Sequence, residues 1–172
     1  MNNSLYKFNL TAKQQFLVLI PFFLINIAIS IGAFYFFESP NTTAILIGAA
    51  VVFVLNVLPV LILHIQYLFK GHNSVAIDTQ NRTIELQGSG SNKKYSLDDI
   101  ASFDYYATHG HCSKRGSSLW YTFDPYRFYK ITFKDNHVAY ITCLSINDIE
   151  NTLEPLLGLQ AEWRFRAIPL LY

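Results

Sequence analysis

Two long stretches without a charged side chain dominate the first half of this sequence. Residues 16–37 read FLVLIPFFLINIAISIGAFYFF, and residues 44–69 read AILIGAAVVFVLNVLPVLILHIQYLF. At about 1.5 Å of rise per residue, a helix of either length crosses a hydrocarbon core of about 30 Å. A signal peptide is the alternative for the first stretch, but no small-residue cleavage pattern follows it. The pattern therefore predicts two transmembrane helices.

The flanks of the two stretches predict their orientation. The connection over residues 38–43 is short and contains no Lys or Arg, which indicates a tight antiparallel hairpin. Basic residues precede the first stretch and follow the second, namely Lys7, Lys13, Lys70, Arg82, Lys93 and Lys94. By the positive-inside rule, both termini are expected in the cytoplasm. Thiols stay reduced in that compartment, so Cys112 and Cys143 are expected to be free.

One polar pair is expected inside this hairpin. Asn26 lies near the middle of the first stretch and Asn56 near the middle of the second. In an antiparallel hairpin the two amides reach a similar depth, where amide side chains hydrogen-bond between helices. An ion or substrate path is the alternative, although neither stretch contains Asp, Glu, Lys or Arg. We expect Asn26 and Asn56 to hydrogen-bond to each other.

After Gly71 the hydrophobic pattern changes from helical to alternating, which is typical of β-strands. Ser145 and Asp148 then offer a capping box, and apolar residues follow at helical spacing up to Gly158. The second half therefore predicts an all-β unit closed by one amphipathic helix. The expected strands are residues 74–78, 82–87, 93–97, 100–108, 118–124, 128–134 and 137–144.

The order of these segments resembles that of bacterial membrane proteins with a pleckstrin-homology-like (PH-like) domain. The resemblance lies in two apolar stretches followed by SVAIDTQNRTIEL, KKYSLDDIASF and FYKITFKDNHVAYITC, then by a helix. It implies an α+β membrane protein with a transmembrane hairpin, a seven-stranded PH-like β-barrel and a C-terminal capping helix. The implied divisions are an N-terminal segment with the hairpin (1–70), a cytosolic PH-like domain (71–158) and a tail (159–172). The implied location is the bacterial inner membrane, as a multi-pass protein integral to the lipid bilayer.

The resemblance implies a binding role, because PH-like barrels are mostly recognition modules without catalysis. Phosphoinositide is an unlikely ligand, since the first hairpin of the domain offers only Arg82 as a basic residue. Nucleic acid is also unlikely, because the net charge is +1 and no basic stripe with aromatics is present. No cofactor is expected, and the partner is expected to be a protein of unknown identity.

The stretch THGHCSKRG contains the most suggestive group of reactive side chains. His109, His111 and Cys112 lie within four residues of one another, as zinc ligands or a nucleophile with its base would. However, His109 and His111 alternate along an extended chain, and no CxxC or HExxH partner is present. We interpret the stretch as a polar loop between strands, with a metal site and a Cys112 nucleophile as the alternatives.

Aromatic and basic residues near that loop are candidates for contact with a partner. Protein interfaces are enriched in aromatic residues and Arg, and on this basis we predict Arg115, Trp120, Tyr126 and Arg127 as partner-facing residues. The tail after Gly158 is the next candidate. It mixes basic and apolar residues, so it either returns to a membrane surface or adds to a sheet edge.

Three functions fit this sequence. The first is a non-enzymatic, membrane-anchored interaction module that acts as a scaffold or assembly factor at the cytoplasmic face. The second is an immunity protein that neutralises a toxin acting at the inner membrane. The third is a small metal-dependent membrane enzyme that uses the loop with His109, His111 and Cys112.

Overall fold

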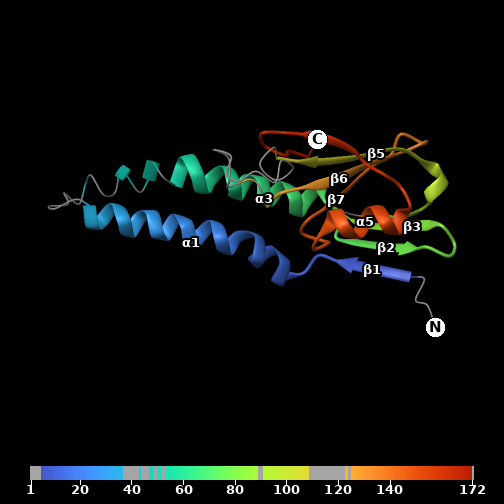
Figure 1. Cartoon of the computed structure of the whole chain (residues 1–172), viewed down its shortest axis with the longest axis horizontal. Helices are drawn as coiled ribbons and strands as arrows, with labels where there is room; N and C mark the ends of the chain where they lie inside the picture. The colour runs from blue at the N-terminus through green and yellow to red at the C-terminus, as the bar shows by residue number, and fades with distance from the viewer. Residues whose placement is uncertain are drawn as a thin grey trace.

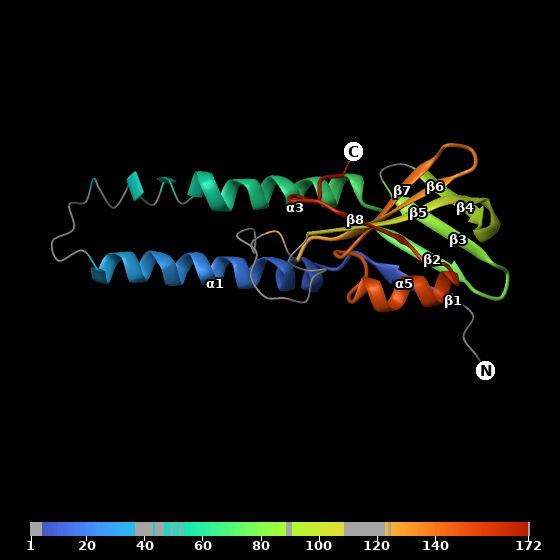
Figure 2. The same ribbon diagram turned by 45° about the horizontal axis from the view of Figure 1, so that its top comes forward.

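The protein consists of a helical arm and a unit of β-strands (Figure 1). The computed structural model describes residues 5–36, 43, 47–48, 50–51, 53–88, 91–108, 123 and 125–171. In the arm, α1 (Ala12–Phe36) and α3 (Leu58–Lys70) extend side by side away from the strands (Figure 2). A π-helical turn, η1 (Phe53–Val57), directly precedes α3.

The first sheet begins with residues that come before the arm. Its order is β1-β2-β3-β4, and each pair of neighbours is antiparallel. The strands are β1 (Leu5–Asn9), β2 (Ser74–Asp78), β3 (Thr83–Gly88) and β4 (Ser91–Ser96). The backbone N–H of Leu10 donates to Asn73 O at 2.7 Å, so the start of α1 and the end of α3 meet at the same edge of the strand unit.

The second sheet has the order β7-β6-β5-β8. Its strands are β5 (Ile100–Ala107), β6 (Phe128–Phe133), β7 (Val138–Thr142) and β8 (Glu162–Phe165). A short 3-10 helix, η2 (Leu97–Asp99), connects the two sheets. The pairs among β5, β6 and β7 are antiparallel, whereas β8 runs parallel to β5. The last strand therefore comes from the tail and forms an edge of this sheet.

Alternating apolar residues of both sheets form the core of the strand unit. In β2 and β3 the buried side chains are Val75, Ile77, Ile84 and Leu86. Helix α5 (Ile149–Leu157) buries Ile149, Leu153 and Leu157 against them, at the i, i+4, i+8 spacing of one helix face. The helix ends at Gly158, whose φ of 66° suits a residue without a Cβ.

Most of the predicted strands agree with the structure. The expected segments 74–78, 82–87, 93–97, 100–108, 128–134 and 137–144 correspond to β2 to β7, and the expected C-terminal helix corresponds to α5. The predicted capping box is wrong, because Asp148 precedes α5 and makes no side-chain capping bond. The predicted strand 118–124 falls almost wholly on residues outside the described part of the chain.

The predicted membrane-spanning hairpin needs a correction. Within the residues that the structure describes, no helix combines the length and the apolar composition needed to cross a membrane. From residue 53 onward, the second apolar stretch is divided between η1 and α3, and α3 has 13 residues. A helix of that length spans about 20 Å. Its inner face is also buried within the protein, at Leu63, His64 and Tyr67.

This finding overturns two predictions from the sequence. The predicted fold class, a transmembrane hairpin followed by a seven-stranded barrel, is replaced by an α+β fold whose described strands form two four-stranded sheets. The predicted multi-pass location in a bacterial inner membrane, with both termini cytoplasmic, is likewise not supported.

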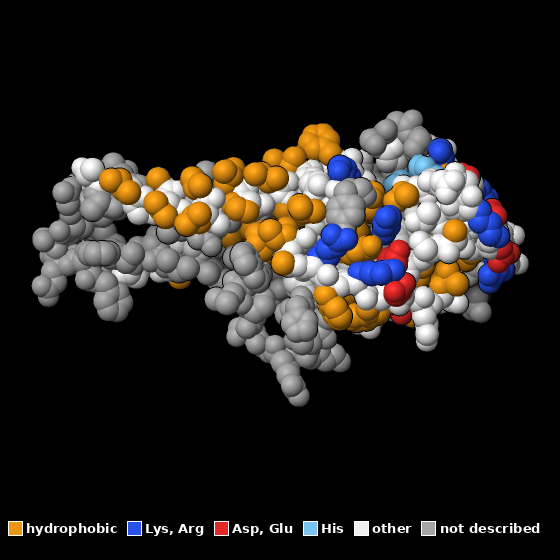
Figure 3. All heavy atoms as spheres, turned by 90° about the horizontal axis from the view of Figure 1, so that it is seen from above, with side chains coloured by type: hydrophobic (Ala, Val, Ile, Leu, Met, Phe, Trp, Pro, Cys, Tyr) orange, Lys and Arg blue, Asp and Glu red, His pale blue; other side chains and the backbone are white. Residues whose placement is uncertain are grey.

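On the face shown in Figure 3, hydrophobic side chains cover the described part of the arm, and charged side chains gather over the strand unit.

The junction between α3 and β7 is tightly packed at Gly71. Gly71 is buried, and its N–H donates to Tyr67 O at 3.1 Å. The next residue, His72, donates its backbone N–H to Tyr140 O at 3.0 Å. A Cβ on Gly71 would lie 2.5 Å from Tyr67 O and 3.0 Å from Thr142 Cγ2. The end of the arm therefore approaches β7 too closely for a side chain.

Replacing Gly71 with Ala is expected to lower the free energy of unfolding by about 1–3 kcal/mol, because packed backbone must shift to admit a methyl group. Gly32→Ala is the matched control. A Cβ at Gly32, in the interior of α1, meets nothing within 4 Å, and Ala favours a helix over Gly by about 1 kcal/mol. Chemical denaturation of both variants measures the difference. Equal stability of the two variants would contradict the close approach.

Candidate protein-binding site

The loop with the suggestive histidines cannot be placed in this fold. His109, His111, Cys112, Arg115 and Trp120 all lie outside the described residues. Among the residues that are described, no group of three His, Cys, Asp or Glu side chains is arranged to hold a metal ion. The interpretation of the loop, and the roles of Arg115 and Trp120, stay predictions.

Tyr126 is placed inside the protein. Its side chain is 1% exposed, and its hydroxyl lies 3.0 Å from His64 Nδ1 on α3. The Tyr126 ring also meets the Tyr67 ring edge-on at 5.2 Å. Burial raises the pKa of Tyr126 and lowers the pKa of His64, so it favours the neutral form of each group. Tyr126 links the arm to the strand unit and does not offer its ring to a partner.

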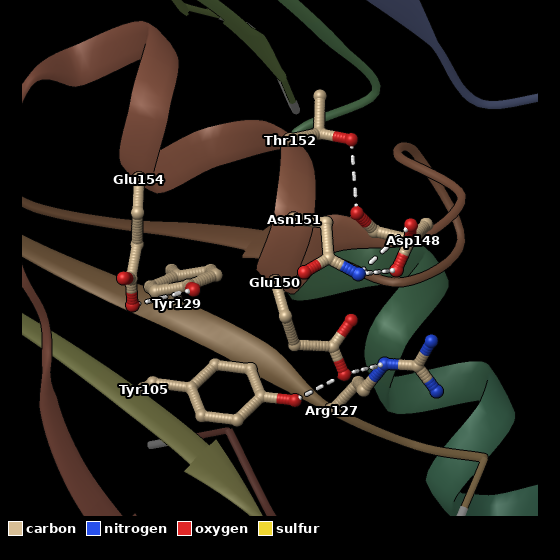
Figure 4. Close-up of polar contacts among 8 residues, drawn as sticks. All are labelled: Tyr105, Arg127, Tyr129, Asp148, Glu150, Asn151, Thr152 and Glu154. Carbon is tan, nitrogen blue, oxygen red and sulfur yellow. Dashed lines mark hydrogen bonds and ion pairs between the residues drawn. The ribbon is translucent and has the colours of Figure 1, made fainter.

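Arg127 is also engaged within the protein (Figure 4). Its Nε lies 2.6 Å from Glu150 Oε1 on α5, and the two side chains are only 19% and 15% exposed. This contact is an ion pair, because the Nε–H does not meet hydrogen-bond geometry with any partner. The Tyr105 hydroxyl donates to the same Glu150 oxygen at 2.5 Å.

A second tyrosine repeats this arrangement one turn further along α5. The Tyr129 hydroxyl donates to Glu154 Oε1 at 3.1 Å, and burial raises the pKa of Tyr129. Two carboxylates of α5 thus receive hydroxyl groups from neighbouring strands β5 and β6. These contacts fix α5 on the second sheet, and they give the carboxylates structural partners.

The predicted contact between Asn26 and Asn56 stays a prediction. The Asn26 side chain donates from Nδ2 to Phe22 O at 2.8 Å, within its own helix. The side chain of Asn56 lies outside the described part of the structure. No contact between the two amides is therefore assigned.

The tail offers the most exposed aromatic residues of the second sheet. All four residues of β8 are exposed, including Trp163 at 47% and Phe165 at 56%. We call Trp163, Arg164, Phe165 and Arg166 the β8 patch. The sequence had left two destinations open for this tail. The structure shows that it adds to a sheet edge, next to β5.

Three side chains of the β8 patch contact side chains of β5 beneath them. The Trp163 ring lies 4.9 Å from the Tyr105 ring, and Arg164 Nε lies 3.2 Å from Asp104 Oδ1. The guanidinium of Arg166 lies 5.4 Å from the centre of the Tyr106 ring, in cation–π geometry. Three consecutive residues of β5 thus hold the patch in place.

Comparison with known families identifies the class of this fold. Residues 5–151 match the family described as PH domain, and this match covers most of the chain, including the arm and β1. The protein therefore belongs to the PH domain family. No curated protein and no solved structure matches the chain. Domains of this family are generally interaction modules without enzymatic activity.

Replacing Glu150 with Gln is expected to lower the free energy of unfolding by about 2–3 kcal/mol, because Arg127 then keeps a charge without its largely buried partner. Asp98→Asn is the matched control. It breaks the Arg82–Asp98 pair, whose side chains are 58% and 70% exposed, and such a pair contributes at most about 1 kcal/mol. Denaturant titrations compare the two variants. A loss as small in Glu150→Gln as in the control would contradict the structural role of this pair.

Proposed function

We propose that the protein is a non-enzymatic scaffold that binds a partner protein through the β8 patch. The observation that carries this proposal is the exposure of Trp163 and Phe165 on a strand at the edge of the second sheet. Membership of the PH domain family supports an interaction role in general. The position and chemistry of β8 support this particular surface.

The edge position of β8 supports strand addition by the partner. Among the strands that the structure describes, β8 pairs with β5 and is the last strand of its sheet. A strand at a sheet edge presents backbone N–H and C=O groups that a second extended chain can pair with. The main chain of β8 would then contribute affinity, and its side chains would contribute selectivity.

The side chains of the patch are suited to an interface and are already held in position. Trp and Arg are the residue types that most often dominate the energy of protein interfaces. Arg164 is restrained by Asp104 at 3.2 Å and by Glu162 at 2.8 Å, and Trp163 is restrained by the Tyr105 ring. Less side-chain entropy is lost on binding when a side chain is held in place beforehand.

The two other functions that fit the sequence receive no comparable support. An immunity protein also acts by surface complementarity, but nothing in the described residues points to a toxin. The metal-dependent enzyme needs the loop with His109, His111 and Cys112, which lies outside the described residues. We therefore propose the scaffold alone.

A photoreactive amino acid placed at Phe165 in cells is expected to give a discrete crosslinked adduct with a protein partner. Lys94 is the matched control, because it is exposed on β4, the edge strand of the other sheet. Adding Trp163→Ala to the chain labelled at 165 is expected to lower the adduct by about tenfold or more, as for a residue that dominates an interface. Equal adducts from positions 165 and 94 would contradict the proposal.

A further inference from the structure

The tail continues beyond β8 and is held a second time, on the arm. The side chain of Gln66 donates from Nε2 to Leu171 O at 2.7 Å and accepts from the Leu171 N–H at 3.2 Å. One amide side chain thus satisfies both backbone groups of one residue, as a neighbouring β-strand would. Figure 2 shows the end of the tail lying against α3.

Two further side chains of α3 bind the backbone of the tail. Lys70 donates from Nζ to Leu171 O at 2.8 Å, and the Tyr67 hydroxyl donates to Pro169 O at 2.9 Å. We call Gln66, Tyr67 and Lys70 the tail notch. Every hydrogen bond from the notch reaches a backbone group of the tail. These bonds therefore hold the main chain of the tail without selecting its side chains.

Selectivity for a side chain comes from one apolar position. Leu171 is 0% exposed and belongs to the same buried cluster as Val60, Leu63 and Tyr67 of α3. Its neighbour Leu170 is 42% exposed. Pro169 restricts the backbone in advance and contributes only the carbonyl that Tyr67 binds. The Leu170 N–H donates to Ile168 O at 2.9 Å, so the tail turns at Pro169. The notch therefore fits a segment that turns at a proline and has a buried aliphatic residue two positions later.

The segment that fills the notch is joined to the fold by features that permit its release. The four residues of β8 are all exposed, and β8 lies at the edge of its sheet among the described strands. The connection from α5 begins at Gly158, which has a positive φ of 66° and is exposed. Few buried contacts and an edge position are typical of segments that open locally at low cost in free energy.

We propose that the tail notch is a binding site for a short peptide segment of a partner protein, with a proline two positions before an aliphatic residue, and that the tail occupies this site in cis. The proposal deepens the scaffold role and rests on it, since the partner is a protein in both. The tail itself shows the chemistry that the notch accepts. The N–H and C=O of Leu171 bond to Gln66, and the aliphatic side chain of the same residue is buried. A partner segment of the same chemistry competes with the tail.

The test uses full-length protein and a fluorescent peptide with the sequence of residues 162–172. Leu171→Asp removes the buried side chain and releases the tail, and the peptide then supplies an intact segment in trans. Leu170→Asp is the matched control, because it places the same charge at an exposed neighbour. A double variant, Leu171→Asp with Gln66→Ala, also removes the side chain that binds both backbone groups of residue 171. Fluorescence anisotropy measures binding, and circular dichroism confirms that each variant is folded.

The Leu171→Asp protein is expected to bind the peptide saturably. The unmodified chain and Leu170→Asp are expected to bind it at least about tenfold more weakly, because only the fraction with an open notch is competent. The double variant is expected to lose binding. Absence of binding to folded Leu171→Asp, or equal binding to the double variant, overturns the proposal. The crosslinking at position 165 is measured separately, so its failure is distinguishable from a failure of the notch.

Discussion

The backbone of the tail is held by two different parts of the molecule, and this double attachment determines where the tail lies. At one end, β8 pairs with the main chain of β5, and Arg166 N–H donates to Ala107 O at 3.0 Å. At the other end, side chains of α3 bind Pro169 and Leu171. The tail therefore connects the second sheet to the arm, and it presents the β8 patch from between them.

The attachment works because polar groups inside the junction all find partners. Tyr67 is 1% exposed, and its hydroxyl reaches Pro169 O. His64 and Tyr126 satisfy each other at 3.0 Å. Loss of the tail would remove Pro169 O, the acceptor of the Tyr67 hydroxyl. A buried polar group without a partner costs about 1–3 kcal/mol. The same side chains that bury the base of the arm thus also favour the bound tail.

The sequence predicted those strands that alternate clearly between buried and exposed residues. In β2 and β3 this alternation places Val75, Ile77, Ile84 and Leu86 in the core, and both strands were expected where they occur. In contrast, β1 and β8 have almost no buried side chain. Backbone pairing with a partner far along the chain fixes their position, and periodicity in one sequence does not report such pairing.

The apolar stretches and the site residues show a different limit. An apolar side chain suits a helix in lipid and a helix packed against protein, so the composition of α3 did not reveal that Leu63 is buried within the fold. Tyr126 was predicted from its residue type alone, whereas its place follows from contact with His64, 62 positions away. The tail was recognised as a second candidate, and its pairing with β5 required the structure.

Amide hydrogen exchange of the tail, resolved by residue in NMR spectra of the full chain, tests the double attachment most directly. The account predicts slow exchange at Arg166, whose N–H donates to Ala107 O, and at Leu171, whose N–H donates to Gln66 Oε1. It also predicts faster exchange at both positions in Gln66→Ala, because the two attachments hold one segment. Exchange at Arg166 and Leu171 as fast as in an unstructured peptide, in the unmodified protein, would contradict it.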